Sequence, residues 1–132
     1  MARGTVPMGV MATVLLVEND PDVREIVHEV LASRGIRMIA AAHGREALEQ
    51  LAHAPARPDL ILLDLTMPVM SGWEFLDAKA QDPAIASIPV VVMSAMSEIE
   101  QARGRWIDVV RKPVRLETLL ALIHRHTPAL TG

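Results

Sequence analysis

Hydrophobic residues along the chain form two alternating patterns. Short apolar runs rich in Val, Ile, Leu and Ala are typical of strands buried on both faces of a parallel sheet. They predict strands at residues 13–17, 36–41, 60–64, 90–93 and 107–110. Between these runs, apolar residues recur three and four positions apart, which predicts amphipathic helices. Helices are expected from Pro21 to before Gly35, at residues 45–53, 72–80 and 97–102, and from Leu116 to before Pro128.

The periodicity also predicts which helix faces are buried. The inner face of the first helix is predicted to consist of Val23, Ile26, Val27, Val30 and Leu31. The inner face of the second is predicted to consist of Ala47, Leu48, Leu51 and Ala52. Both stripes follow the spacing of a helix that packs one side against a sheet.

Strands that alternate with helices imply a doubly wound α/β fold, with a parallel sheet covered on both faces. At 132 residues the chain has room for one domain. We expect that domain to span residues 12–127, between a flexible N-terminal tail at 1–11 and a C-terminal tail at 128–132. We expect no separate output domain after these residues.

Composition narrows the classes of function. The net charge is −3, so the sequence indicates no basic field for nucleic acid or an anionic membrane. No apolar run reaches the ~18 residues that a membrane span requires. Cysteine is absent, which excludes disulfides and cysteine-ligated metals and fits a reducing compartment. We therefore expect a cytoplasmic protein.

Polar residues follow the predicted strands at their carboxyl ends, where the sites of open α/β sheets collect. They are Glu18, Asn19 and Asp20 after the first strand, Asp64 at the end of the third, Ser94 after the fourth and Lys112 after the fifth. Two acids in one cleft favour a shared cation, and oxygen-only ligands suit Mg²⁺. A hydroxyl and an ammonium complete a pocket for a phosphoryl group, in which a carboxylate can act as the nucleophile.

Each residue alone has a simpler interpretation. Asp64 alone is equally well explained as an acid that caps a turn. The simpler interpretation of Lys112 is a solvated lysine at a strand end. The use of lysine favours a role for Lys112, because the chain has eleven Arg and only two Lys. A compact ammonium fits a tight phosphate site better than a planar guanidinium does.

The motifs VLLVENDPDVREIV, DLILLDLTMPVMSGWEFL, VVVMSA and RKPV, in this order, resemble the receiver domain of two-component response regulators. The resemblance covers roughly residues 13–126 and implies a flavodoxin-like fold of five strands and five helices, with strand order 2-1-3-4-5. It implies that Asp64 is the phosphoacceptor, with Ser94 as the switch hydroxyl and Lys112 as the phosphoryl contact. Glu18, Asn19, Asp64 and the Thr66 carbonyl are implied as the Mg²⁺ ligands.

The resemblance also implies partners. A histidine kinase or a histidine phosphotransfer protein would donate the phosphoryl group, and an unknown downstream protein would read the result. The domain would promote its own phosphorylation rather than act as a conventional enzyme. Such domains commonly dimerise or dock partners through a face that corresponds here to the helix at 97–102, the strand at 107–110 and the last helix. No DNA-binding domain and no membrane contact are expected.

Three features depart from the family pattern. Asn19 occupies the position of a second acid, so we expect weaker Mg²⁺ binding. Val109 replaces the switch aromatic, and Trp106 is a candidate to fill the vacated volume, although packing alone also explains it. The interval from Ser94 to Lys112 is about four residues short, about one helical turn.

These departures leave alternative functions open. A pseudo-receiver that binds partners without phosphate is favoured by Asn19, Val109 and the short fourth helix. It is opposed by Asp64, Ser94 and Lys112. An aspartate-dependent phosphohydrolase normally needs a second acid two residues after the nucleophile, where this chain has Thr66. A flavin site is disfavoured because the loop after the first strand is acidic.

Overall fold

The computed structural model of the protein describes residues 12–54, 57–65, 70–94, 106–112 and 114–127. Its elements are β1 (Ala12–Val17), α1 (Pro21–Ser33), β2 (Ile36–Ala41), α2 (Gly44–His53), β3 (Leu60–Asp64), α3 (Gly72–Ala80), β4 (Val90–Ser94), β5 (Asp108–Arg111) and α4 (Leu116–His126). Among these residues, no helix has the length and apolarity needed to cross a bilayer.

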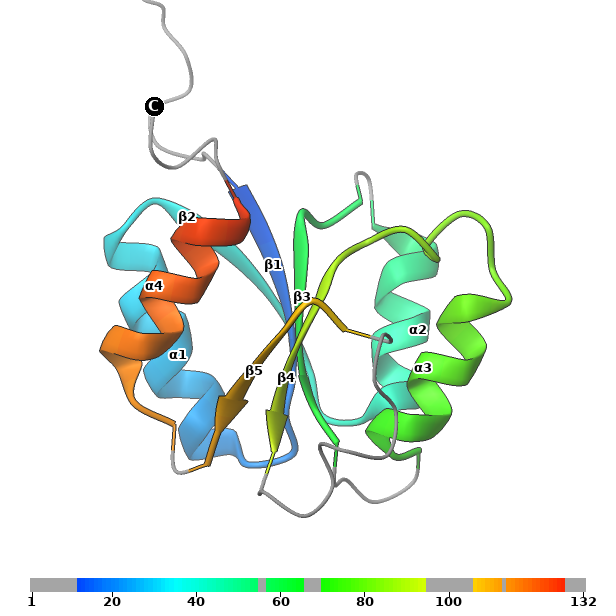
Figure 1. Cartoon of the computed structure of the whole chain (residues 1–132), viewed down its shortest axis with the longest axis horizontal. Helices are drawn as coiled ribbons and strands as arrows, with labels where there is room; N and C mark the ends of the chain where they lie inside the picture. Colours follow the sequence, from blue (N-terminus) through cyan, green and yellow to red (C-terminus); the bar gives the residue numbers. More distant parts are fainter. Residues whose placement is uncertain (1–11, 55–56, 66–69, 95–105, 113, 128–132) are drawn as a thin grey trace, which may run out of the picture.

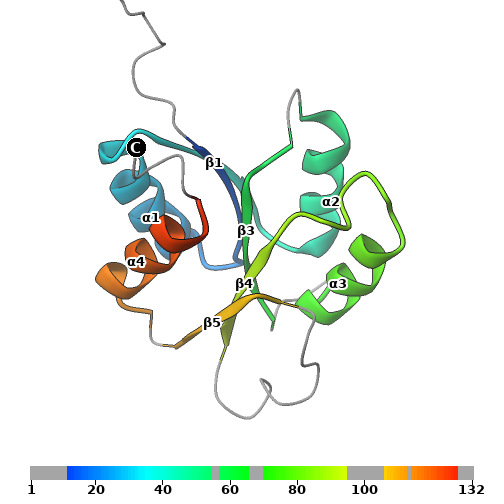
Figure 2. The ribbon, with the colours of Figure 1, turned by 45° about the horizontal axis from the view of Figure 1, so that its top comes forward.

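The strands form one parallel sheet in the order β2-β1-β3-β4-β5. Helices α1 and α4 cover one face, and α2 and α3 cover the other (Figures 1 and 2). The predicted doubly wound fold and strand order are confirmed. The described residues contain four helices, and the expected short helix at 97–102 lies outside them.

Strand β3 forms the centre of the core because both of its faces are buried. Ile61 and Leu63 belong to the cluster under α2 and α3, while Leu60 and Leu62 belong to the cluster under α1 and α4. Each of these side chains is 0% exposed, and burial of each contributes about 1.5–3 kcal/mol. This burial on both faces explains why the sequence of β3 is a continuous apolar run up to Asp64.

Local signals fix where the helices begin. Asp20 caps α1 by accepting a hydrogen bond from the Asp22 amide at 2.9 Å, and Pro21 occupies the first turn. Ser71 and Glu74 form a reciprocal capping box at the start of α3. Both helices therefore begin at the carboxyl edge of the sheet, next to the predicted site.

Two predictions of buried helix positions are wrong. Ile26 on α1 is 49% exposed, and Ala52 on α2 is exposed as well. Val27 and Leu31 make the core contact of α1, and Ala47 makes that of α2. Helical spacing identifies the apolar face of a helix. Which residues of that face are buried depends on how much of it the neighbouring elements cover.

Helix α3 contains a buried lysine in its last turn that the sequence did not indicate. The Lys79 side chain donates a hydrogen bond to the Ala86 carbonyl at 2.7 Å, and the residue is 6% exposed. Burial, together with the charge of Arg57, lowers the pKa of Lys79. Lys79 thus fixes the loop that precedes β4.

Candidate functional site

Asp64 is the last residue of β3 and lies at the carboxyl edge of the sheet, where it is 1% exposed. Helix α3 begins close behind it at Gly72, whose amide donates to the Leu65 carbonyl at 3.0 Å. A Cβ at position 72 would lie 2.6 Å from the Asp64 carbonyl oxygen. Only glycine therefore allows α3 to start this close to the end of β3.

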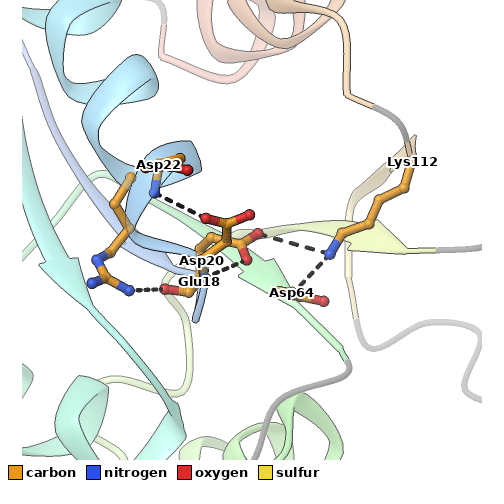
Figure 3. A network of polar contacts seen from close by, with 6 residues as sticks. Glu18, Asp20, Asp22, Asp64 and Lys112 are labelled. Atoms are coloured by element: carbon orange, nitrogen blue, oxygen red, sulfur yellow. Dashed lines mark hydrogen bonds and ion pairs between the residues drawn. The ribbon is translucent and has the colours of Figure 1, made fainter.

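Lys112 follows β5 directly and reaches over the end of β3. Its Nζ lies 2.9 Å from Asp64 Oδ2 and 3.8 Å from Glu18 Oε1 (Figure 3). Its backbone amide donates to the Ser94 carbonyl at 3.1 Å, which ties it to the end of β4. The Lys112 side chain is 37% exposed, so it contacts two buried acids while part of it lies at the surface.

Glu18 follows β1, and its carboxyl group is buried beside Asp64. Its Oε2 accepts a hydrogen bond from the Asp20 amide at 3.0 Å. Burial raises the pKa of Glu18, and the charge of Asp64 raises it further, while the Asp20 amide and Lys112 offset only part of the increase. The raised pKa of Glu18 thus follows first from its burial and then from its position beside Asp64.

The other predicted site residues differ in placement. Ser94 is the last residue of β4 and is 1% exposed, so it belongs to the same edge of the sheet as Asp64. Asn19 is exposed in the loop between β1 and α1. Thr66 lies outside the described residues. The structure therefore brings Glu18, Asp64 and Lys112 into contact.

A cleft of about 630 Å³ opens beside these residues, between α1 and the segment that leads into α4. Its polar end contains Glu18, Asn19, Asp20 and Lys112. Its apolar wall is formed by Val23, Ile26, Val27, Met93, Val114 and Leu116. The exposed Ile26 thus borders this cleft, although its helical position predicted burial.

Sequence reasoning missed Arg24 of α1. Its Nη1 donates to the Glu18 backbone carbonyl at 2.7 Å. The signal that could have indicated it is an arginine on the first turns of a helix that starts from an acidic loop. This signal does not identify the partner, because every residue of the loop offers a backbone carbonyl.

The chain matches the response regulator receiver domain over residues 14–124. The protein therefore belongs to this family, whose members are signalling modules of two-component systems. Relatives and solved structures support the same assignment.

Protein Rrf1 of Nitratidesulfovibrio vulgaris is 30% identical over 114 residues, which are 86% of this chain and 81% of that protein. A probable cyclic di-GMP phosphodiesterase of Vibrio cholerae is 36% identical over 118 residues, and the chain spans only 26% of its length. The structure of the Vibrio cholerae chemotaxis protein CheY4 superposes with a TM-score of 0.78 at 32% identity, covering 89% of this chain and 99% of that one. The match to CheY4 confirms the fold over nearly the whole chain.

Proposed function

We propose that this receiver domain accepts a phosphoryl group on Asp64 from a phosphohistidine of a kinase or phosphotransfer protein. The observation that carries the proposal is the contact of 2.9 Å between the buried Asp64 carboxylate and the Lys112 ammonium. A buried carboxylate at a strand end, with one compact cation against it, suits a nucleophile for a phosphoryl group.

In the proposed step, a carboxylate oxygen of Asp64 attacks phosphorus. The new O–P bond forms as the N–P bond of the donor breaks, and the imidazole leaves with the electron pair. The Lys112 ammonium, which contacts Asp64 before transfer, would then stabilise the negative charge on the phosphoryl oxygens. Ser94, at the end of the neighbouring strand, is proposed to donate its hydroxyl to one of these oxygens.

The acid pair fits a magnesium ion. Glu18 and Asp64 are 3% and 1% exposed and share one ammonium, and the raised pKa of Glu18 reflects its burial and the nearby Asp64 charge. In the described part of the chain, no third acidic, histidine or cysteine side chain completes a metal cluster. The family resemblance implies the Asn19 amide and the Thr66 carbonyl as further ligands, and together with water they form a set that Mg²⁺ accepts. Bound Mg²⁺ would neutralise oxygens of the phosphoryl group during transfer.

The cleft between α1 and α4 is the proposed docking site for the protein donor. Its apolar wall includes the half-exposed Ile26, and its polar end leads to Lys112. An apolar surface beside a reactive group favours a protein partner that buries both. A histidine kinase or histidine phosphotransfer protein meets this requirement.

How phosphorylation of Asp64 would change binding to a downstream protein stays a prediction. Val109 is partly buried against the cluster under α2 and α3, as are Trp73 and Trp106, whose ring centroids lie 5.9 Å apart. This pair supports a packing role for Trp106 near the position of the missing aromatic residue. The predicted dimerisation face includes residues 97–102, which lie outside the described residues.

One experiment tests the proposal: incubation with Mg²⁺ and acetyl phosphate, followed by measurement of intact mass. We expect one added phosphoryl group in the wild type and none in Asp64→Ala. Asp22→Ala, which removes an exposed acid of α1, should retain the adduct. Absence of an adduct in the wild type at high donor and Mg²⁺ would contradict the proposal and favour a pseudo-receiver.

A further inference from the structure

Arg24 joins α1 to the loop that carries the proposed metal ligands. Its guanidinium Nη1 lies 2.7 Å from the Glu18 carbonyl oxygen, and its backbone amide donates to the Asp20 carbonyl at 3.1 Å. One residue thus bonds to both ends of the three-residue loop. Asn19 lies between the two bonded carbonyls.

The Glu18 backbone is held from two directions. Its amide donates to the Ala41 carbonyl at 3.0 Å, at the end of β2, while its carbonyl accepts from Arg24. The first bond is neutral and the second is charge-assisted, which makes the second roughly twice as strong. The hydrogen bond from Arg24 therefore contributes much of the stabilisation of the backbone conformation that leads from β1 into the loop.

We propose that Arg24 is a positioning residue for the metal site, which orients Glu18 and Asn19 through the Glu18 carbonyl. This inference rests on the proposed function, because it concerns the same site. Groups that orient ligands have large effects on metal affinity. The effect should be pronounced here because one ligand, Asn19, is neutral and its side chain is exposed.

Charge alone predicts the opposite result. A guanidinium at the acidic end of α1 repels a divalent cation, so its removal should strengthen binding if Arg24 acted only through its field. Removal should weaken binding if Arg24 holds the ligands in place. The sign of the change in affinity therefore separates the two roles.

The test compares Arg24→Gln, Arg24→Lys and the control Arg34→Gln, which removes the same charge from the exposed far end of α1. Binding of Mn²⁺ is measured from the electron paramagnetic resonance signal of the free ion, with Mg²⁺ as competitor. We expect Arg24→Gln to weaken binding about tenfold. Arg24→Lys should weaken it about threefold, because a lysine keeps the charge and one donor without the planar fork. Arg34→Gln should match the wild type.

Unchanged or tighter binding in Arg24→Gln would overturn the inference. If that variant does not fold, by circular dichroism, Arg24→Lys carries the test, and wild-type affinity in that variant would overturn it. If the proposed function itself is wrong, the measurements will differ in another way, because the wild type would then bind neither metal nor phosphoryl group. A wild type that binds and is phosphorylated, beside an Arg24→Gln variant of equal affinity, would refute the role of Arg24 alone.

Discussion

Two charged clusters lie at opposite ends of β5 and differ in their balance of charge. The cluster beyond its last residue joins Lys112 to two acids, Glu18 and Asp64. The cluster at its first residue joins Asp108 to Arg125 at 3.2 Å and to His126 at 3.1 Å. In these described contacts, two acids approach one lysine in the first cluster, and an arginine and a histidine approach one acid in the second.

The pKa directions follow this balance. Burial and the neighbouring Asp64 charge raise the pKa of Glu18. Burial also acts to raise the pKa of Asp108, but hydrogen bonds from His126 and the Val109 amide, with the charge of Arg125, outweigh it and lower the pKa. The comparison distinguishes a cluster that fastens α4 to the sheet from one that, under the proposed function, would hold a magnesium ion.

The largest effect is expected from Lys112→Met. The change leaves two buried carboxylates without the ammonium between them, and we expect it to lower the free energy of unfolding by about 2 kcal/mol without Mg²⁺. Added Mg²⁺ should restore more stability in the variant than it adds to the wild type. Urea unfolding with EDTA or MgCl₂ measures both quantities.

Arg111→Met is the matched control, since it removes the exposed cation next to Lys112 in the sequence. It should change the free energy of unfolding by less than 0.5 kcal/mol, as most exposed substitutions do. Equal stability of Lys112→Met and the wild type in EDTA would show that the acid pair does not depend on this cation.

Glu18→Gln should instead raise the free energy of unfolding. Glutamine keeps an acceptor for the Asp20 amide but removes one of two buried negative charges, so we expect a gain of about 1 kcal/mol in EDTA at neutral pH. The same variant should lose the stabilisation that Mg²⁺ gives the wild type. Glu25→Gln, an exposed change on α1, serves as the control. A loss of stability in Glu18→Gln would mean that the pair is already neutralised.

The fold could be predicted from the sequence because strands buried on both faces must be apolar at every position. β3 and β4 show this, and their ends carry Asp64 and Ser94 to the site. The contact of Lys112 with Asp64 followed from the same logic, since parallel strands bring their carboxyl ends to one edge.

Side chains whose roles depend on neighbouring elements could not be predicted. Ile26 fits the buried stripe of α1, yet it borders a cleft because none of the described elements covers that side of the helix. Arg24 is typical of a solvated helix position until its guanidinium is seen to reach the Glu18 carbonyl. His126 had no apparent role in the sequence, and its contact with Asp108 needs the packing of α4 against β5.

The smallest effect is expected from Asp108→Asn. The variant loses the ion pair with Arg125, which is 64% exposed, so we expect a cost of about 0.5 kcal/mol at neutral pH. Because folding lowers the pKa of Asp108, its contribution is present above the ordinary value of 3.8 and is lost as the pH falls through the folded value. The difference between variant and wild type should therefore shrink below pH 3.8, whereas Glu29→Gln, an exposed change on α1, should show no such trend. Urea unfolding across this range measures the difference, and a constant gap would assign the effect of Asp108 to packing rather than to its charge.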